Sequence, residues 1–245
     1  MSKVKPVNKR VLVVAAHPDD EVLGCGGTIA RHINESDSVH VVILAEGITS
    51  RSQTNAEEAK QKELSKLAQA AQQANEILGV TSLTLHNFPD NRMDSVDRLD
   101  VIKMVEGVVE KIQPEIVYTH HAGDINIDHR RIHEAVITAC RPQPGHCVKT
   151  LLFFEVASST ECQSPGVAPP FHANWFVDIS STFNKKSEAL LAYASEMRDW
   201  PHARSVKALE HLARWRGSCV GVEAAEAFIL GRRVFYKDSE LTYSI

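Results

Sequence analysis

A histidine and two adjacent aspartates form a cluster of reactive side chains near the start of the 245-residue chain. His17, Asp19 and Asp20 follow the apolar run at residues 11–16, and His129 closes a second polar run further along. Two histidines and one carboxylate match the three protein ligands of a catalytic zinc ion, which leaves one position open for water. The other carboxylate would then accept a proton from that water. Spacing alone does not decide which aspartate is the ligand and which is the base.

The acidic cluster also has less specific explanations. Acidic side chains often precede helices because they cap the first turn, but a His-Pro pair before two aspartates exceeds what capping requires. Adjacent carboxylates repel unless a cation or a proton lies between them. The glycines at positions 24, 26 and 27 do not meet the G-x-G-x-x-G spacing of a dinucleotide loop. A nucleotide-binding protein that holds magnesium is therefore the weaker alternative, because magnesium avoids imidazole ligands.

The elements that position these residues follow from the hydrophobic pattern. An unbroken apolar run at residues 11–16 is typical of a buried strand, and further strands are expected at residues 38–45, 81–88 and 115–119. Apolar residues spaced by threes and fours predict helices at residues 56–78, 96–112 and 130–140. This alternation predicts a three-layer α/β fold with a mostly parallel, Rossmann-like sheet and helices on both faces. The polar loops after the strands should open at one edge, where ligands bind in such sheets.

The C-terminal part of the chain has a less regular pattern. Strands are expected at residues 149–156 and 174–179, and helices at residues 182–200, 205–216 and 223–227. The segment 158–172 contains three of the ten prolines, which indicates a loop that acts as a lid or a substrate wall. The sequence contains no linker or repeat, so residues 1–245 are expected to form a single domain with an irregular, helical C-terminal part.

Composition argues against several classes of protein. A net charge of -4 without a basic block disfavours nucleic-acid binding. No stretch is long enough to span a bilayer, and the first ten residues lack an apolar signal core. The five cysteines include no C-x-x-C pair and are expected to be reduced thiols of a cytoplasmic protein. The sequence does not reveal the oligomeric state, and a homo-oligomer is compatible with it.

Two motifs resemble those of a known family. The sequence AHPDDE at residues 16–21, followed by a glycine-rich turn, resembles the signature of the PIG-L (LmbE-like) N-deacetylases, and residues 120–129 resemble their second metal motif. The resemblance implies that His17, Asp20 and His129 hold zinc, with Asp19 as the general base. It also implies removal of an acetyl group from an N-acetylated amino sugar, as a GlcNAc-type glycoconjugate or nucleotide sugar. A zinc amidase acting on a thiol conjugate or another amide is the alternative.

One position departs from the pattern of this family. Many members carry a histidine three residues before the last metal-binding histidine, and this chain has Asn126 there. An asparagine can donate a hydrogen bond to an oxyanion but cannot act as an acid. The candidates for the acid are therefore His120, His121, His202, or Asp19 returning its proton. One of the two adjacent histidines could instead be packed or support a metal ligand.

Further charged residues are expected near the same edge of the sheet. Arg51, Arg92 and Asp94 lie in loops after predicted strands, where they could bind sugar hydroxyls or form salt bridges within their loops. Arg204 lies with His202 in a helix break that could close the pocket, and helix capping is the alternative. Asp128 is expected to orient an imidazole rather than to bind the metal.

Overall fold

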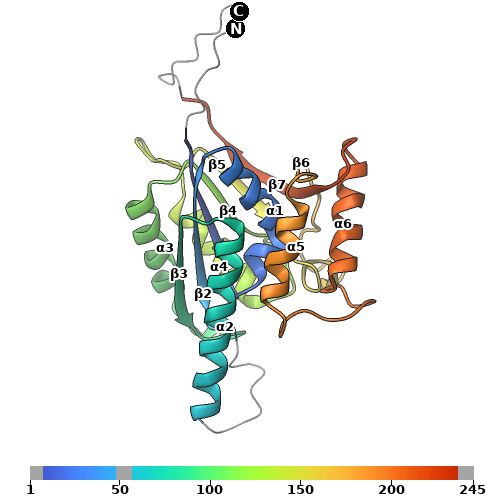
Figure 1. Ribbon diagram of the computed structural model, residues 1–245. Coiled ribbons are helices and arrows are strands. Elements are labelled where there is room, and N and C mark those ends of the chain that lie inside the picture. The colour runs from blue at the N-terminus through green and yellow to red at the C-terminus, as the bar shows by residue number, and fades with distance from the viewer. Residues whose placement is uncertain (1–7, 48–56, 237–245) are drawn as a thin grey trace, which may run out of the picture.

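A computed structural model describes residues 8–47 and 57–236 of the chain. Its strands are β1 Arg10–Ala15, β2 Ser38–Ala45, β3 Ser82–Phe88, β4 Ile116–His120, β5 Thr150–Phe154, β6 Trp175–Asp178 and β7 Ala225–Arg233. They form one sheet with the order β3-β2-β1-β4-β5-β7-β6 (Figure 1). The first five strands in this order are parallel, and β7 runs antiparallel to both β5 and β6.

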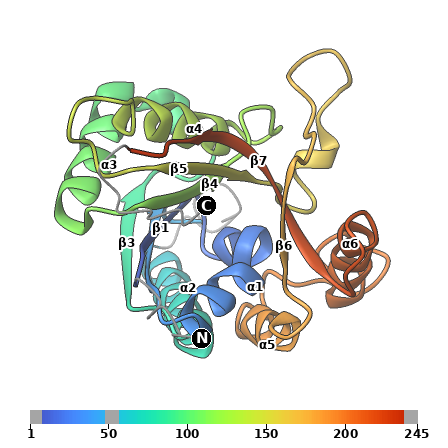
Figure 2. The ribbon, with the colours of Figure 1, turned by 90° about the horizontal axis from the view of Figure 1, so that it is seen from above.

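Helices cover both faces of this sheet. They are α1 Asp20–Asn34, α2 Glu57–Leu78, α3 Arg98–Ile112, α4 Ile127–Ala139, α5 Phe183–Ala192 and α6 Val206–Ser218, with 3-10 turns at Met93–Ser95 and Thr160–Cys162. Figure 2 shows α1, α2 and α5 on one face, α3 and α4 on the other, and α6 beside β6 and β7. The predicted three-layer α/β fold with a mostly parallel sheet is confirmed.

The unbroken apolar run of β1 is explained by burial on both faces. Val11, Val13 and Ala15 pack into the core beneath α1, α2 and α5. Successive strand residues point to opposite faces, so Leu12 and Val14 join the second core beneath α3 and α4. A central strand without a solvent-facing side has no alternation of polar and apolar residues.

The strand order creates a crevice at the carboxyl ends of β1 and β4. From β1 the chain proceeds to β2 and then β3 on one side, whereas β4 and β5 lie on the other side. The loops that follow β1 and β4 therefore diverge, and such a switch point is where ligands bind in open α/β sheets. Both sequence motifs lie in these two loops.

Two expectations for the C-terminal part are wrong. The alanines of residues 223–227 predict a helix, but Ala225 begins the long strand β7. Ala225 and Ala227 are buried there and Phe228 packs in the core, so tertiary packing overrides the helical preference of alanine. The helix expected to reach residue 200 ends at Ala192, and Tyr193 at its C-cap enters the core instead.

Membrane-spanning helices are absent from the described segments. None of their helices combines the length and the apolar character needed to cross a bilayer.

Candidate metal centre

Three potential metal ligands converge at the carboxyl ends of β1 and β4. His17 and Asp20 come from the loop after β1 and the start of α1, and His129 lies in the first turn of α4. All three are buried, and one ligand atom from each lies within 4.8 Å of the other two. Asp20 Oδ2 is 3.2 Å from His17 Nδ1 and 3.1 Å from His129 Nε2. The carboxylate thus lies between two imidazoles that come from distant parts of the sequence.

Carboxylates behind His17 fix the orientation of its ring. Its Nε2 lies 2.9 Å from Asp128 Oδ2 and 3.2 Å from Asp90 Oδ1. Asp128 is itself held by the backbone N–H groups of Asn91, at 2.6 Å, and Met93, at 2.9 Å. Because Nε2 faces these acids, Nδ1 is the nitrogen that faces Asp20 and the candidate metal position.

Asp124 supports His129 in a similar way. Asp124 Oδ2 lies 3.2 Å from His129 Nδ1. The same carboxylate accepts hydrogen bonds from the hydroxyls of Thr160, at 2.6 Å, and Ser159. His129 therefore presents Nε2 to the centre, and the 3-10 turn at residues 160–162 is tied to the ligand loop through Asp124.

Unpaired polar atoms at the centre fit a bound cation. Asp20 Oδ1 is buried and has no hydrogen-bond partner among the residues described, and His129 Nε2 faces only the other oxygen of the same carboxylate, at 3.1 Å. A buried carboxylate oxygen without a partner is costly, and a coordinated metal would remove that cost. Two imidazole nitrogens and one carboxylate oxygen form a donor set suited to zinc.

The pKa values show that the cluster stabilises positive charge. Burial opposes ionisation of Asp20, but the neighbouring imidazoles, above all His129, hold its pKa well below the usual range. Burial lowers the pKa of His129, but Asp20 and Asp124 outweigh this and raise it to about 9. Burial also opposes the charge of His17, while hydrogen bonds to three carboxylates hold its pKa well above the usual value. The raised pKa values mean that both imidazoles hold protons in the absence of a metal. A cation bound between them would take the place of these protons.

Asp19 lies next to this cluster in a strained backbone conformation. Its φ of 118° lies in a region that non-glycine residues rarely adopt, a strain that costs about 1–3 kcal/mol. Its side chain does not cap α1 but accepts a hydrogen bond from Arg204 Nη1 at 2.7 Å. Arg204 Nε donates to Ser158 Oγ at 2.7 Å, so the same guanidinium also holds the segment 158–172. Burial raises the pKa of Asp19 well above its usual range, and Arg204 opposes that rise.

Glu21 is a buried acid that supports the Asp19 backbone. Its Oε2 accepts from the Asp19 N–H at 3.1 Å, and its Oε1 accepts from Tyr193 Oη at 2.6 Å and Asn75 Nδ2 at 3.0 Å. Burial raises its pKa to about 7, despite these hydrogen bonds. The early end of α5 places Tyr193 in this network.

The three candidate acid histidines lie in different surroundings. His120 is fully buried, accepts from the Ala16 N–H at 2.8 Å and stacks on His129 with ring centroids 3.9 Å apart. Burial lowers its pKa well below the usual value. His121 Nε2 lies 2.8 Å from the Pro169 carbonyl oxygen. His202 is exposed, and its Nδ1 accepts from the Arg204 N–H at 3.0 Å. This geometry does not favour His120 or His202 as the acid.

The side chain of Asn126 forms the N-cap of α4. Its Oδ1 accepts from the Asp128 N–H at 2.8 Å and caps α4. Its Nδ2 donates to Asn91 Oδ1 at 3.0 Å. An amide nitrogen carries two hydrogens, so the second is not used by the bond to Asn91.

Of the other predicted binding residues, the two that the structure describes are not brought to the centre. Arg92 and Asp94 are exposed, and no contact among the described residues joins either side chain to the metal cluster. Arg51 lies outside the described residues. The segment 158–172 does pack on the loop after β4, because a Cβ at Gly123 would collide with the Pro169 carbonyl.

Sequence reasoning missed three acids of the site: Asp90, Asp124 and Glu21. Asp90 and Asp124 lie in polar loops after β3 and β4. Their positions could have indicated the site, because ligands bind at this edge of such sheets. Glu21 belongs to the AHPDDE motif itself, but its buried partners Asn75 and Tyr193 come from α2 and the end of α5. No local pattern points to that pairing.

Comparison with known proteins agrees with this geometry. The family model described as PIG-L, GlcNAc-PI de-N-acetylase, matches residues 12–140. The chain belongs to the PIG-L family. The region matched includes the proposed metal ligands of both loops, so the resemblance inferred from the motifs is confirmed.

The relatives and solved structures that are similar to this chain carry several names. A probable N-acetyl-alpha-D-glucosaminyl L-malate deacetylase 2 of Bacillus anthracis is 27% identical over 190 residues, which cover 77% of this chain and 81% of that protein. A 4-oxalmesaconate hydratase of Pseudomonas putida is 30% identical over 209 residues, covering 79% and 76%. The solved N,N'-diacetylchitobiose deacetylase of Pyrococcus horikoshii superposes with a TM-score of 0.74 at 21% identity, covering 97% and 89%. At that identity the structural match shows the shared fold alone.

Proposed function

We propose that this PIG-L protein is a zinc-dependent hydrolase that removes the acetyl group from an N-acetylated amino sugar. The observation that carries the proposal is the convergence of His17, Asp20 and His129, with Asp19 beside them at the sheet's switch point. The Bacillus anthracis relative, named a deacetylase of a glucosaminyl malate, supports the sugar substrate.

His17, Asp20 and His129 are the residues that would hold the metal. When bound, zinc supplies a Lewis acid for the acetamide carbonyl and lowers the pKa of a coordinated water to about 7. Asp128 and Asp124 keep the two imidazoles oriented toward the centre, at 2.9 Å and 3.2 Å from their outer nitrogens.

Asp19 acts first as a base and then as an acid in this proposal. It takes a proton from the attacking water, whose oxygen forms a bond to the acetamide carbon. The free N–H of Asn126 donates to the carbonyl oxygen as negative charge develops there. Asp19 then returns its proton to the nitrogen as the C–N bond breaks, which releases acetate and the amine. This assignment needs no proton from His120 or His202.

Arg204 holds Asp19 and closes one side of the site. Its hydrogen bonds to Asp19 and Ser158 connect the base to the segment 158–172. We propose that Arg204 also binds sugar hydroxyls, and that Arg51, Arg92 and Asp94 form an outer rim. The charged groups of such a rim would choose among sugar substrates by hydrogen bonding.

The relative named a hydratase supports a second candidate. Hydration of a carbon–carbon double bond also needs a base beside an activated water, but it releases neither acetate nor an amine. The thiol-conjugate amidase alternative differs only in the amide that is cleaved. The products therefore separate all three activities.

A substrate screen tests the proposal directly. N-acetylated sugars, nucleotide sugars and thiol glycoconjugates are incubated with the protein, and acetate and free amine are measured. We expect release that a chelator abolishes and added zinc restores, and that His17→Ala lacks. An unsaturated acid that gains water while no acetamide is cleaved would show a hydratase instead.

A further inference from the structure

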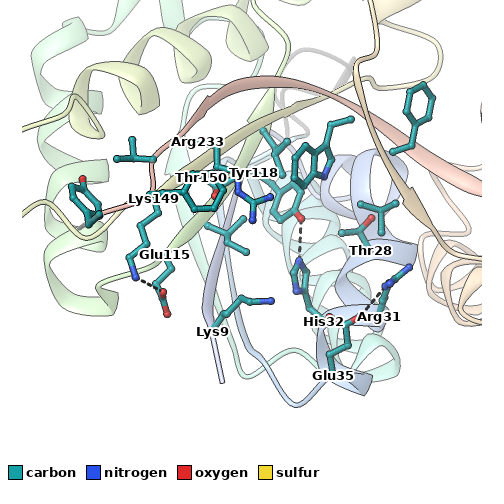
Figure 3. A pocket seen from close by; sticks show the side chains of 18 residues that line it. Lys9, Thr28, Arg31, His32, Glu35, Glu115, Tyr118, Lys149, Thr150 and Arg233 are labelled. Carbon is teal, nitrogen blue, oxygen red and sulfur yellow. Dashed lines mark hydrogen bonds and ion pairs between the residues drawn. The ribbon is translucent and has the colours of Figure 1, made fainter. Parts of the chain in front are cut away.

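A second cavity lies at the opposite edge of the sheet from the metal centre. Its volume is about 620 Å³, and its lining includes residues at the amino ends of three parallel strands. Lys9 precedes β1, Glu115 precedes β4 and Lys149 precedes β5, whereas the metal-centre loops follow the other ends of β1 and β4. Figure 3 shows these side chains around the cavity together with the end of α1. The cavity and the metal centre share no residue.

The charges of the cavity leave two cations unneutralised. Its acids are already paired: Arg31 Nε lies 2.9 Å from Glu35 Oε1, and Lys149 Nζ lies 2.8 Å from Glu115 Oε2. The two other cations, on Lys9 and Arg233, have no acidic partner within the described part of the chain. With the carboxylate of Asp37, which lies beside His32, included, the cavity still has an excess of positive charge, and this excess favours a negatively charged ligand.

Arg233 is held by aromatic rings rather than by an acid. Its guanidinium carbon lies 5.2 Å from the centre of the Trp175 ring and 4.9 Å from that of Phe235. Such contacts use the face of the guanidinium and leave its edge N–H groups free to bind a carboxylate or phosphate. The same rings provide an apolar surface for the body of a ligand.

The half-buried His32 and the buried Tyr118 line another side of the cavity, and His32 is joined to the buried Asp37. His32 Nδ1 lies 2.8 Å from Asp37 Oδ2, so this nitrogen carries the proton and donates to the carboxylate. His32 Nε2, 3.0 Å from Tyr118 Oη, is then the acceptor of the phenol hydrogen. Burial lowers the pKa of His32 and raises that of Tyr118, which keeps both groups neutral. The oxygen of Tyr118 thus offers lone pairs to a ligand hydroxyl.

Thr28 adds a donor that lacks a partner. Its side chain lines the cavity and is 1% exposed, and Oγ1 makes no hydrogen bond to any described residue. Its backbone N–H is satisfied separately by Glu226 Oε2 at 2.7 Å. An unpartnered buried hydroxyl costs free energy, and a ligand oxygen beside it would remove that cost.

We propose that this cavity is a second binding site, for a small organic anion. The ligand carries a carboxylate or a phosphate for Lys9 and Arg233, a planar or apolar body for the aromatic rings, and a hydroxyl for Tyr118. The volume lies within the range of about 300–1,000 Å³ that is usual for small-molecule sites. The proposal does not depend on the reaction at the metal centre.

Isothermal titration calorimetry of the metal-loaded protein tests it with three probes. These are 4-hydroxybenzoate, phenyl phosphate, and neutral 4-hydroxybenzyl alcohol. We expect one or both anions to bind with a Kd on the order of 1 mM or tighter, as ligands of about ten heavy atoms do. The anion with the lower Kd shows whether the site prefers a carboxylate or a phosphate. The neutral alcohol should bind at least about tenfold more weakly than that anion.

Four variants locate the binding. Lys9→Gln and Arg233→Gln should each raise the Kd about tenfold, as expected for loss of a charge-assisted hydrogen bond. Lys103→Gln, which removes an exposed lysine paired with Glu106 on α3, is the matched control and should leave the Kd unchanged. Thr28→Val should weaken binding without lowering the melting temperature, because the hydroxyl it removes has no partner in the protein. All four should retain acetate release.

Three results would overturn the proposal. The first is that neither anion binds, and the second is that the neutral alcohol binds as well as the anions. The third is that binding is unaffected by Lys9→Gln and Arg233→Gln and inhibits turnover competitively, which would place the probe at the metal. Since binding is measured without turnover, failure of the deacetylase assignment would leave the calorimetric result intact.

Discussion

Arg204 Nη1 donates to Asp19 Oδ2 over 2.7 Å and links the turn before α6 to the start of α1. Glu196 Oε2 lies 3.7 Å from the same nitrogen, so two carboxylates share one guanidinium in a buried space. Burial raises the pKa of Asp19, and Arg204 is the main group that opposes this rise. The fraction of Asp19 that is ionised therefore depends on Arg204.

Arg204→Gln should shift the pH profile of the enzyme. Loss of the cation raises the Asp19 pKa further, so the acid limb of kcat/KM moves to higher pH because the base must be ionised. A shift of one pKa unit corresponds to about tenfold lower activity on that limb, which is regained as the pH rises. Arg204→Lys keeps the charge and should shift the limb less. An equal loss at every pH would mean that Arg204 acts on the substrate and not through Asp19.

Asp19→Asn should separate catalysis from metal binding. An amide cannot accept the proton, so kcat should fall by about 10²–10⁴, the usual contribution of general-base catalysis. The zinc content should stay near that of the wild type, because this substitution leaves His17, Asp20 and His129 unchanged as ligands. Asp20→Asn is the partner experiment and should lose zinc. If the two variants exchanged behaviours, the assigned roles of the two aspartates would be reversed.

Asp124→Asn should weaken the metal site without touching a ligand. Asp124 lies 3.2 Å from His129 Nδ1, and loss of such a partner lowers metal affinity by about 10- to 100-fold. Competition with a chromophoric chelator measures this change. Asp94→Asn, on an exposed loop after β3, is the control of identical chemistry and should leave affinity unchanged. Equal weakening in both variants would argue against a role of Asp124 in orienting His129.

The sequence could predict the parallel part of the fold because its physical signals are local. The unbroken apolar run at residues 11–16 reflects burial on both faces of the sheet, and the His-Pro sequence that follows marks where β1 ends. The same locality explains why His17 and Asp20 could be recognised. His129 could be added because the parallel strands of one sheet bring the loops at their carboxyl ends to one edge.

The remaining features depend on packing that no local pattern records. Tyr193 leaves the helix to reach Glu21, a residue far away in the sequence. The alanines of β7 suit either a helix or a buried strand, and only the neighbours β5 and β6 decide between them. The contact of Arg204 with Asp19 is likewise invisible in the sequence, because it arises from the way the turn before α6 folds over α1.

Glu21→Gln should change how stability depends on pH in the metal-free protein. The folded-state pKa of Glu21 is about 7, above the ordinary value of 4.5, because the group is buried. The folded state therefore holds its proton more tightly, so this stabilisation is complete below pH 4.5 and is lost as the pH rises through 7. Urea unfolding should show the wild type losing stability relative to Glu21→Gln between about pH 5 and pH 8, on the order of a few kcal/mol.

The matched control for Glu21 is another acid with the same chemistry. Glu110→Gln alters an exposed carboxylate on α3 and should run parallel to the wild type across the same pH range. A Glu21→Gln curve that also stays parallel to the wild type would show that Glu21 titrates near its ordinary pKa. The direction of the change is as informative as its size, since a carboxylate stabilised in its ionised form would give the opposite slope.

Variants of Asn126 should separate helix capping from chemistry. Its Oδ1 caps α4 through the Asp128 N–H, and its Nδ2 carries the hydrogen proposed to reach the reacting oxygen. Asn126→Ala removes both functions, so it should lose about 1 kcal/mol of stability and also lose activity. Asn126→Asp keeps a capping acceptor but removes the donor and its hydrogen bond to Asn91, so it should lose less stability than Asn126→Ala. Its kcat should fall by about 10²-fold or more, the usual effect of losing an oxyanion donor.

The comparison of these two variants decides what Asn126 does. Thermal or urea unfolding measures the cap, and acetate release at saturating substrate measures the donor. If Asn126→Asp retained full turnover, the amide hydrogen would have no part in the reaction and Asn126 would be a capping residue only. Because an aspartate would also repel a developing oxyanion, activity that survives this change would be strong evidence against an oxygen reacting nearby.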